Sequence, residues 1–392
     1  MTPSARVQAA IEILDEVIRS ARDNGPPADA IVTRYFKERR YAGSKDRRAV
    51  RELVFRAIRR SGERPDSGRA AMLGLASDDP EIASRFDGSA HGPEDRSPGE
   101  PAAPPAAVPA WLRQHLSPLV TEDEWSSLLE RAPLDLRVNV ARASRDELLG
   151  QFEGAAPTPR SPWGLRLPAD TRVDDHPAFS SGLVEVQDEA SQLVALCCQP
   201  SPDMVILDLC AGAGGKSLAL AAAAPGATLI AADTSRARLS QLPARASRSG
   251  ARIEERLLDG GREPEQLGDL VSRCDLVLVD APCSGSGTWR RNPEGRWRLT
   301  PGRLDQLTGL QQRLLDIAEP LVKPGGALVY ATCSIIRAEG ADQARNFLGR
   351  HSSWVVQDVP IVGGRADGPG RLLTPAHDAT DGFFVARMGR TC

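Results

Sequence analysis

Acidic or thiol side chains follow a series of apolar runs in the second half of the chain. They stand at Asp208, Asp233, Asp259, in Asp280-Ala281-Pro282-Cys283 and in Thr332-Cys333. If the runs are parallel strands, their carboxyl ends share one sheet edge, and neighbouring strands lie roughly 4.8 Å apart. We therefore expect two thiols and a carboxyl group to reach one substrate.

This set of side chains suits attack on a pyrimidine ring. Carbon 5 of a cytosine is too weak a nucleophile to take a methyl group directly, so a thiolate must first add to carbon 6. An acid near N3 would stabilise the charge on the ring, and a base must later remove the carbon 5 proton. Asp280, Cys283 and Cys333 are residues of these types. A lone cysteine after a strand is more often structural, so the prediction depends on the pair.

The stretch VILDLCAGAGGKS, residues 205 to 217, predicts a strand, a glycine-rich turn and a helix start. A Walker loop would need its first glycine at Cys210, and a dinucleotide fingerprint would need its third at Ser217. A nucleoside without pyrophosphate fits better, because Asp233 can accept both ribose hydroxyls. The pattern favours S-adenosylmethionine and leaves open a nicotinamide enzyme or an inert α/β domain.

The elements around this loop alternate. Strands are predicted at 205–209, 227–232, 252–257, 275–279 and 326–331, and helices at 217–224, 235–249, 263–272 and 303–319. Residues 382–388 add a final apolar strand. Alternation with short connections predicts an α/β fold with a doubly wound parallel sheet, which places ligands at the carboxyl ends of its strands.

The first part of the chain is predicted to be helical, without the alternating strands of the second half. Apolar residues at three- and four-residue steps predict helices at 5–22, 28–39 and after Ser44, which we expect to be the N-cap. The chain therefore divides into four parts: a helical domain at 1–86, a Pro- and Ala-rich linker at 87–109, a small α+β subdomain at 110–182 and a catalytic domain at 183–392.

Charge and composition narrow the partners. Residues 31–64 hold twelve Arg and Lys against four acids, although the net charge of the whole chain is −3. Such a local excess indicates a phosphate-backbone partner, although a solvated helix face is an alternative. No apolar run spans a bilayer, and seven cysteines without a C-x-x-C pair indicate a reducing cytoplasm and no metal.

Several segments resemble one family. LDLCAGAGGKS, DAPCSGSGTWRRNPE and VYATCSI, with VQDEASQL upstream and HDATDGFF near the end, look like the RsmB/NOL1/NOP2/Sun family of RNA cytosine-5 methyltransferases. The resemblance covers roughly residues 110 to 392, and the Pro-Cys and Thr-Cys pair is its most specific part. It implies a Rossmann-like class I methyltransferase fold.

The resemblance also implies roles for individual residues. Cys333 would attack carbon 6, Cys283 would assist product release, and Asp280 would contact the cytosine. The residues that would bind S-adenosylmethionine are Cys210, Ala211, Gly212, Ala213, Gly214, Gly215, Lys216, Asp233, Asp259 and Asp280. The family's loop usually reads C-A-A-P-G-G-K, so Gly212 and Ala213 depart from it, and the lost proline frees one φ angle.

Aromatic and basic residues after Cys283 indicate an RNA platform. We expect Trp289, Arg290, Arg291 and Arg298, with Lys216, to contact RNA, because aromatic faces stack unpaired bases and guanidinium groups bind phosphates. Trp297 is as readily explained by packing. The target should be single-stranded or flipped out of its helix.

The segment AGSKDRRAVRELVFRAIRR resembles the NusB-like N-terminal domain of the bacterial rRNA member of this family. It implies that the substrate is small-subunit (16S) rRNA and that the protein takes part in rRNA processing. A tRNA substrate and an inactive RNA-binding assembly factor are the alternatives. We expect a monomer.

Overall fold

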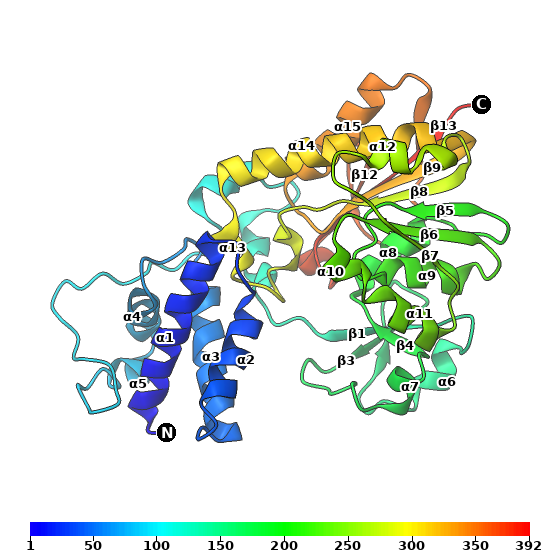
Figure 1. Ribbon diagram of the computed structural model, residues 1–392. Helices are drawn as coiled ribbons and strands as arrows, with labels where there is room; N and C mark the ends of the chain where they lie inside the picture. Colours follow the sequence, from blue (N-terminus) through cyan, green and yellow to red (C-terminus); the bar gives the residue numbers. More distant parts are fainter. The chain divides into compact units, whose positions relative to one another are not determined.

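The computed structural model describes residues 1–392 (Figure 1). The chain forms two compact units. The first, here the helical unit, comprises residues 1–116, 121–130 and 288–301, and the second, here the sheet unit, comprises 117–120, 131–287 and 302–392. The segment 288–301, which follows the loop of Cys283, thus belongs to the helical unit.

The helical unit is built on amphipathic helices. Its elements are α1 (Pro3–Arg22), α2 (Ala28–Glu38), α3 (Ser44–Arg60), α4 (Gly68–Asp78), α5 (Pro80–Ala83), the 3-10 helices η1 (Ala110–His115) and η2 (Glu122–Leu128), and α13 (Gly295–Arg298). Thr2 caps α1 by accepting from the backbone N–H of Ala5. The expected N-cap at Ser44 is wrong by one residue, since Gly43 holds that position and Ser44 begins the helix.

The stretch 87–109 contains no helix or strand. Two of its backbone N–H groups are nevertheless fixed, because Ala103 donates to Ala70 O and Ala106 donates to Arg60 O. The side chain of Val108 is fully buried. This stretch therefore lies along α3 and α4 within the helical unit.

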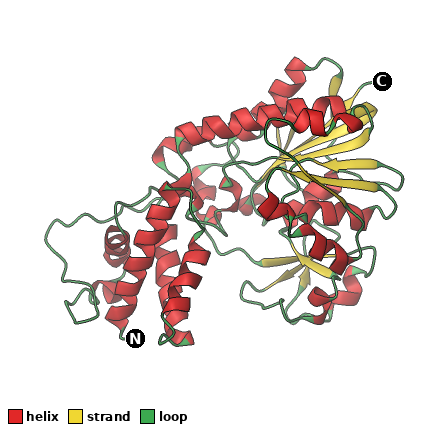
Figure 2. Cartoon of the chain, in the orientation of Figure 1, coloured by secondary structure: helices red, strands yellow, loops and turns green.

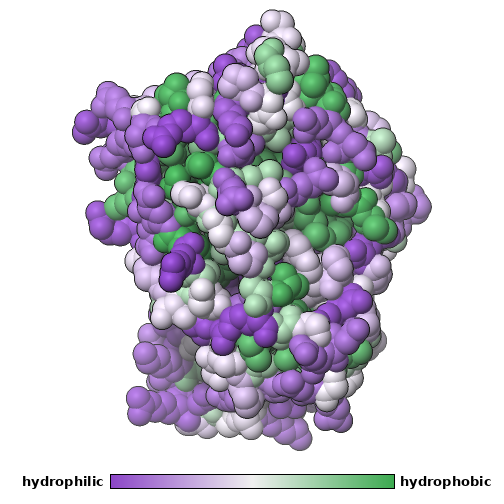
Figure 3. Space-filling view, turned by 90° about the vertical axis from the view of Figure 1, so that its right-hand side faces the viewer, coloured by the Kyte–Doolittle hydropathy of each residue, from purple (hydrophilic) through white to green (hydrophobic).

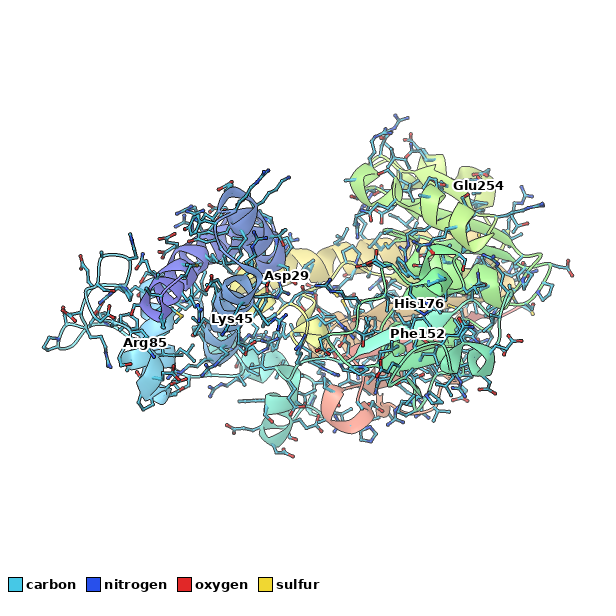
Figure 4. The ribbon with its side chains drawn as sticks, turned by 90° about the horizontal axis from the view of Figure 1, so that it is seen from below. Asp29, Lys45, Arg85, Phe152, His176 and Glu254 are labelled. Carbon is cyan, nitrogen blue, oxygen red and sulfur yellow. The ribbon has the colours of Figure 1, made fainter.

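The sheet unit begins with a small antiparallel sheet of order β2-β3-β1-β4. Its strands are β1 (Leu134–Val138), β2 (Ala156–Pro157), β3 (Gly164–Leu167) and β4 (Val184–Val186), and the short helices α6 (Arg145–Leu149) and α7 (Pro177–Ser180) accompany it. Phe152 and His176 stack beside it with ring centroids 4.0 Å apart (Figure 4).

A nine-stranded sheet follows, in the order β11-β12-β13-β9-β8-β5-β6-β7, with β10 paired to β13. Its strands are β5 (Val205–Asp208), β6 (Thr228–Asp233), β7 (Glu254–Leu257), β8 (Cys274–Asp280), β9 (Val322–Thr332), β10 (Trp354–Gln357), β11 (Arg365–Asp367), β12 (Gly370–Leu373) and β13 (Phe383–Arg390). Strands β5 to β9 are parallel, whereas β10 to β13 pair antiparallel. The sheet is mixed and mainly parallel, not wholly parallel as predicted.

Helices lie on both sides of this sheet (Figure 2). They are α8 (Glu189–Cys197), α9 (Gly215–Ala223), α10 (Arg236–Leu239), α11 (Leu242–Ser249), α12 (Glu263–Gln266), α14 (Pro301–Ala318), α15 (Ala341–Arg350) and α16 (Pro375–Asp378), with 3-10 turns η3 (Gly268–Leu270), η4 (Ser286–Thr288), η5 (Glu319–Leu321) and η6 (Arg337–Glu339). The single helix predicted at 235–249 is broken. Pro243 occupies the first turn of α11, a position that proline favours but from which it cannot continue an earlier helix.

One face of the molecule is drawn by hydropathy in Figure 3. Figure 3 shows hydrophilic side chains spread over much of one face, with apolar side chains in separate groups between them. None of the helices is both long and apolar enough to cross a membrane.

Candidate active site

The glycine-rich loop lies between β5 and α9, as predicted. Gly212 and Gly214 have φ angles of +57° and +82°, in the left-handed region that favours glycine. A Cβ on Gly214 would lie 2.3 Å from a methyl carbon of Leu242, so no larger residue fits there. Gly212, by contrast, faces open space, with only a guanidinium nitrogen of Arg238 within 4 Å. A side chain would therefore have room at Gly212, although the glycine itself is buried and its N–H is bonded to Asp233.

Two arginines bind the outer side of this loop. Arg245 of α11 donates to Ala213 O at 2.5 Å, and Arg137 of β1 donates to Gly215 O at 2.7 Å. Arg245 is held in turn by Glu185 of β4 at 2.8 Å. Burial lowers the pKa of Arg137 to about 10. The small antiparallel sheet thus braces the loop, which the sequence analysis did not predict.

Asp208 and Asp233 end neighbouring strands but make different contacts. Asp208 is buried, and its Oδ2 accepts from Ser217 Oγ at 2.7 Å while Oδ1 has no hydrogen-bond partner. Burial raises the pKa of Asp208 to about 7. Asp233 accepts from the backbone N–H of Gly212 at 2.8 Å and of Ser235 at 2.6 Å. Asp233 therefore connects the glycine-rich loop to the end of β6.

Two other residues of the predicted cofactor site differ in exposure. Asp259 is exposed beyond the end of β7, where its backbone N–H and carboxylate both bind the Gln266 amide. Cys210 is only partly accessible, and burial raises the pKa of its thiol well above the ordinary value. Ala211 is nearly buried, with an exposed fraction of 9%. Asp259 is thus the most open carboxylate of the predicted set.

A partly buried ion pair joins α9 to the end of β8. Lys216 Nζ lies 2.6 Å from Asp280 Oδ2, and the ammonium lies 5.2 Å from the Phe383 ring centroid. Burial alone would lower the pKa of Lys216, but the charge and hydrogen bond of Asp280, together with the charge of Cys333, raise it. The lysine therefore remains a cation beside the loop and the thiols.

The two predicted cysteines meet. Strands β8 and β9 are parallel neighbours, with Asp280 opposite Ala331. The loops that follow place Cys283 Sγ and Cys333 Sγ 3.4 Å apart. Both thiols are partly accessible, whereas Cys197, Cys198 and Cys274 are buried. The hydrogen bond with Cys333, then burial, raises the pKa of Cys283 well above the ordinary value, so Cys283 holds its proton.

The expected RNA platform after Cys283 is instead a packed anchor of the helical unit. Trp289 is only 1% exposed and Arg290 only 8%, while Arg291 is partly exposed. Arg298 donates to Gly25 O and Pro26 O, each at 2.8 Å. The expectation of an open stacking face at Trp289 is therefore corrected, because the ring is buried and has no face free to stack a base.

Neighbouring residues of the segment explain this packing. Trp297 Nε1 donates to Ser61 O at 2.8 Å, and its ring joins the core formed by α1 to α4. Arg296 donates to Ile58 O and Ala107 O, each at 2.6 Å. The sequence alone did not reveal this role, because the partners lie more than 180 residues earlier.

The order of the sheet, the glycine-rich loop and the strand-end acids define a class I methyltransferase. The family model described as 16S rRNA methyltransferase RsmB/F matches residues 195–389. Ribosomal RNA small subunit methyltransferase B from Salmonella paratyphi B is 35% identical over 288 residues, which cover 71% of this chain and 66% of that protein. The chain belongs to the RsmB/F family, whose members are S-adenosylmethionine-dependent RNA methyltransferases.

Solved structures agree on the fold. The crystal structure of PH0851 covers 99% of both chains with a TM-score of 0.77 at 24% identity. NSun6 from Pyrococcus horikoshii, determined with SFG, covers 73% of this chain and 99% of its own, with a TM-score of 0.65 at 20% identity. A methyltransferase homologue from Pyrococcus horikoshii covers 68% of this chain and 89% of its own, with a TM-score of 0.59 at 26% identity.

The residues present fit the cofactor of this family. The carboxylate of Asp233 accepts from Gly212, Ser235 and Arg238 and keeps lone-pair capacity that a ribose hydroxyl can use. Lys216 and Asp280 lie beside the glycine-rich loop, in the first turn of α9 and at the end of β8.

Proposed function

We propose that this protein transfers a methyl group to carbon 5 of a cytidine in RNA through a covalent enzyme–RNA adduct. The observation that supports the proposal best is the 3.4 Å contact between Cys283 Sγ and Cys333 Sγ at the edge of the sheet that holds the Lys216–Asp280 pair. A single thiol at this edge would not distinguish this reaction from other reactions that use one cysteine. Two thiols beside a carboxylate suit attack and release on one ring.

The proposed reaction begins with Cys333. Its thiolate forms a bond to carbon 6, and the electron pair of the 5,6 double bond moves into the ring, where the Lys216–Asp280 pair offsets the charge. S-adenosylmethionine supplies the methyl group that carbon 5 then attacks. Loss of the carbon 5 proton restores the double bond, and the bond between carbon 6 and the Cys333 sulfur breaks. One methyl group replaces one proton, and the thiolate is regenerated.

Cys283 is proposed to assist the release step. In the free protein its proton is held chiefly by the contact with Cys333. Formation of the carbon–sulfur bond removes the negative charge from Cys333, so Cys283 ionises more readily at the stage that needs a base. The contact between the two sulfurs therefore keeps Cys283 protonated during the attack by Cys333 and lets it act as a base afterwards.

The helical unit is proposed to contribute an RNA-binding surface, here the α2–α3 corner. Its members are the exposed residues Lys37, Arg40, Tyr41, Lys45 and Arg48, of which Lys45 is labelled in Figure 4. The Tyr41 side chain is 75% exposed, and no ion pair engages the four cations. Other arginines of residues 31–64 are neutralised, since Arg51 pairs with Asp29 and Arg56 with Asp79. The corner therefore combines unpaired charge with a stacking face.

Small-subunit rRNA is the proposed substrate. The 35% identity with a small-subunit methyltransferase supports this choice, although the match spans only 66% of that relative. The same proposal includes a NusB-like helical region and a division of the chain into four parts at residues 86, 109 and 182. It also includes a cytoplasmic location and a monomeric state.

Bisulfite sequencing of total RNA from a deletion strain tests the function. One cytidine of small-subunit rRNA should lose its protection from conversion, and the native gene should restore it. Cys333→Ala should not restore it, whereas Cys392→Ala should, because Cys392 is an exposed thiol outside the sulfur pair. Loss of protection at a cytidine of a tRNA would mean that the substrate is a tRNA and not rRNA. No loss of protection in any RNA would refute the proposed function.

A further inference from the structure

A buried carboxylate that has no predicted role lies behind the two cysteines. The side chain of Glu339, at the end of η6, is fully buried. Its Oε1 accepts from the Ser284 backbone N–H at 2.8 Å and from Gln311 Nε2 at 3.0 Å. Its Oε2 accepts from the hydroxyls of Ser284 and Ser334, the latter at 2.6 Å. This set of donors is suited to an ionised carboxylate.

The hydrogen bonds of Glu339 connect the two catalytic loops. Ser284 directly follows Cys283, and Ser334 directly follows Cys333. Gln311 of α14 strengthens the connection by also donating to Pro282 O at 3.0 Å. A single carboxylate therefore holds the backbone beside both sulfurs.

The wider hydrogen-bond network orders the same loops. Ser286 Oγ lies 2.9 Å from Ser334 Oγ and accepts from the Ile335 backbone N–H at 3.0 Å. Tyr330 donates to the backbone oxygen of Glu339 at 2.6 Å, which fixes η6 against β9. These contacts leave the carboxylate little freedom to move away.

The charge of Glu339 faces Cys283 without a cation to neutralise it. No ion pair engages Glu339, and the cation of this site, Lys216, pairs with Asp280 instead. The titratable groups that interact with Cys283 are Cys333, Glu339 and Tyr330, whereas Lys216 interacts with Cys333 and Asp280. After the hydrogen bond with Cys333 and burial, the charges of Cys333 and Glu339 also raise the pKa of Cys283.

We propose that Glu339 is a positioning residue that holds the loops of Cys283 and Cys333 at contact distance and places a negative charge behind them, so that Cys333 and not Cys283 is the attacking group. The inference rests on the proposed function for its consequence in catalysis. Its effect on the thiols is a property of the protein alone and is measured without RNA.

The first test is Glu339→Gln, which keeps the size of the side chain and removes its charge. The protein is treated with iodoacetamide until each molecule carries at most one label, and mass spectrometry locates the label. The exposed Cys392 is also labelled, so the share is taken within the sulfur pair, where native protein should carry the label mainly at Cys333. In the variant the share at Cys283 should rise several-fold, because removing the negative charge of Glu339 removes one of the causes that raise the pKa of Cys283. An unchanged share would overturn the charge effect, whether or not the protein methylates RNA.

Matched variants separate charge from positioning. Ser284→Ala and Ser334→Ala keep the carboxylate but remove one tether each, so kcat for methylation should fall roughly tenfold while the labelling share shifts less than in Glu339→Gln. The Kd for S-adenosylmethionine should not change, because neither serine touches the glycine-rich loop. Native kcat in both serine variants would overturn the positioning role of Glu339. The serine variants also test that role if Glu339→Gln fails to fold.

Asp342→Asn is the control for these variants. Asp342 lies three residues beyond Glu339 but binds Arg337 and Arg345, away from the cysteines. This control should be native in labelling and in kcat. A similar shift in the control would mean that any lost charge in this region moves the thiols, and would overturn the assignment to Glu339.

Discussion

Lys216 and Asp280, which lie in the first turn of α9 and at the end of β8, form an ion pair with a Nζ–Oδ2 distance of 2.6 Å. The pair joins the loop proposed to hold the cofactor to the loop that carries Cys283. It places a buried cation within range of the charge on Cys333, which helps to raise the pKa of Lys216. Cofactor loop and thiols are therefore parts of one electrostatic site.

Cys283→Ala should trap a covalent protein–RNA adduct. Attack by Cys333 does not need the second thiol, whereas release does, so the adduct should accumulate when S-adenosylmethionine and substrate RNA are present. A denaturing gel with labelled RNA detects the adduct as a band that migrates more slowly than free RNA. The double variant Cys283→Ala, Cys333→Ala should show no band, and normal turnover in the single variant would contradict the role of Cys283.

Arg245→Ala should weaken S-adenosylmethionine binding. Arg245 holds Ala213 O, at the position where the family has proline, so its loss should free the loop and raise the Kd by about tenfold, or ~1.4 kcal/mol. Arg248→Ala is a matched control, because Arg248 binds the same Glu185 without touching the loop. Calorimetry measures both variants, and equal losses in the two would show that Glu185, not the loop contact, matters.

Asp208 should make the folded protein less stable as the pH rises. Its pKa of about 7, raised by burial from 3.8, means that the folded state binds more protons than the unfolded state between these values. Its contribution to the free energy of unfolding should therefore fall from about pH 4 to pH 7 and then level off.

Asp208→Asn removes this titration while keeping an acceptor for Ser217. The Tm of the variant relative to the native protein should rise between pH 5 and pH 8. Thermal unfolding without cofactor measures it, with the exposed Asp305→Asn as the control. A difference in Tm that does not change with pH would mean that Asp208 titrates in its ordinary range.

Replacing Lys37, Arg40, Lys45 and Arg48 by Gln should weaken RNA binding and its dependence on salt. Each lost phosphate contact lowers the slope of log K against log salt by about 0.7 for a single strand, so the slope should fall by up to about 3. Arg51→Gln with Arg56→Gln is the control, because both arginines are already paired. An unaltered slope in the fourfold variant would mean that the α2–α3 corner does not bind RNA.

Local patterns in the sequence were sufficient to predict the main strands and helices of the sheet unit. The apolar run at 205–208 and the glycines after it predicted β5 and its loop, because strand and turn preferences act over a few residues. The strand-end rule then placed Cys283 and Cys333 at one edge. Their pairing on adjacent parallel strands is confirmed, with the sulfurs 3.4 Å apart.

Only the tertiary structure decided what depends on distant neighbours. Whether Trp289 stacks a base or packs in a core depends on what covers its ring, and Trp297 beside it is anchored to Ser61. Glu339 gave no local signal, since its partner Ser284 lies 55 residues away. Side-chain type and spacing determine which chemistry is available, but burial and long-range hydrogen bonds determine which side chains are in a position to perform it.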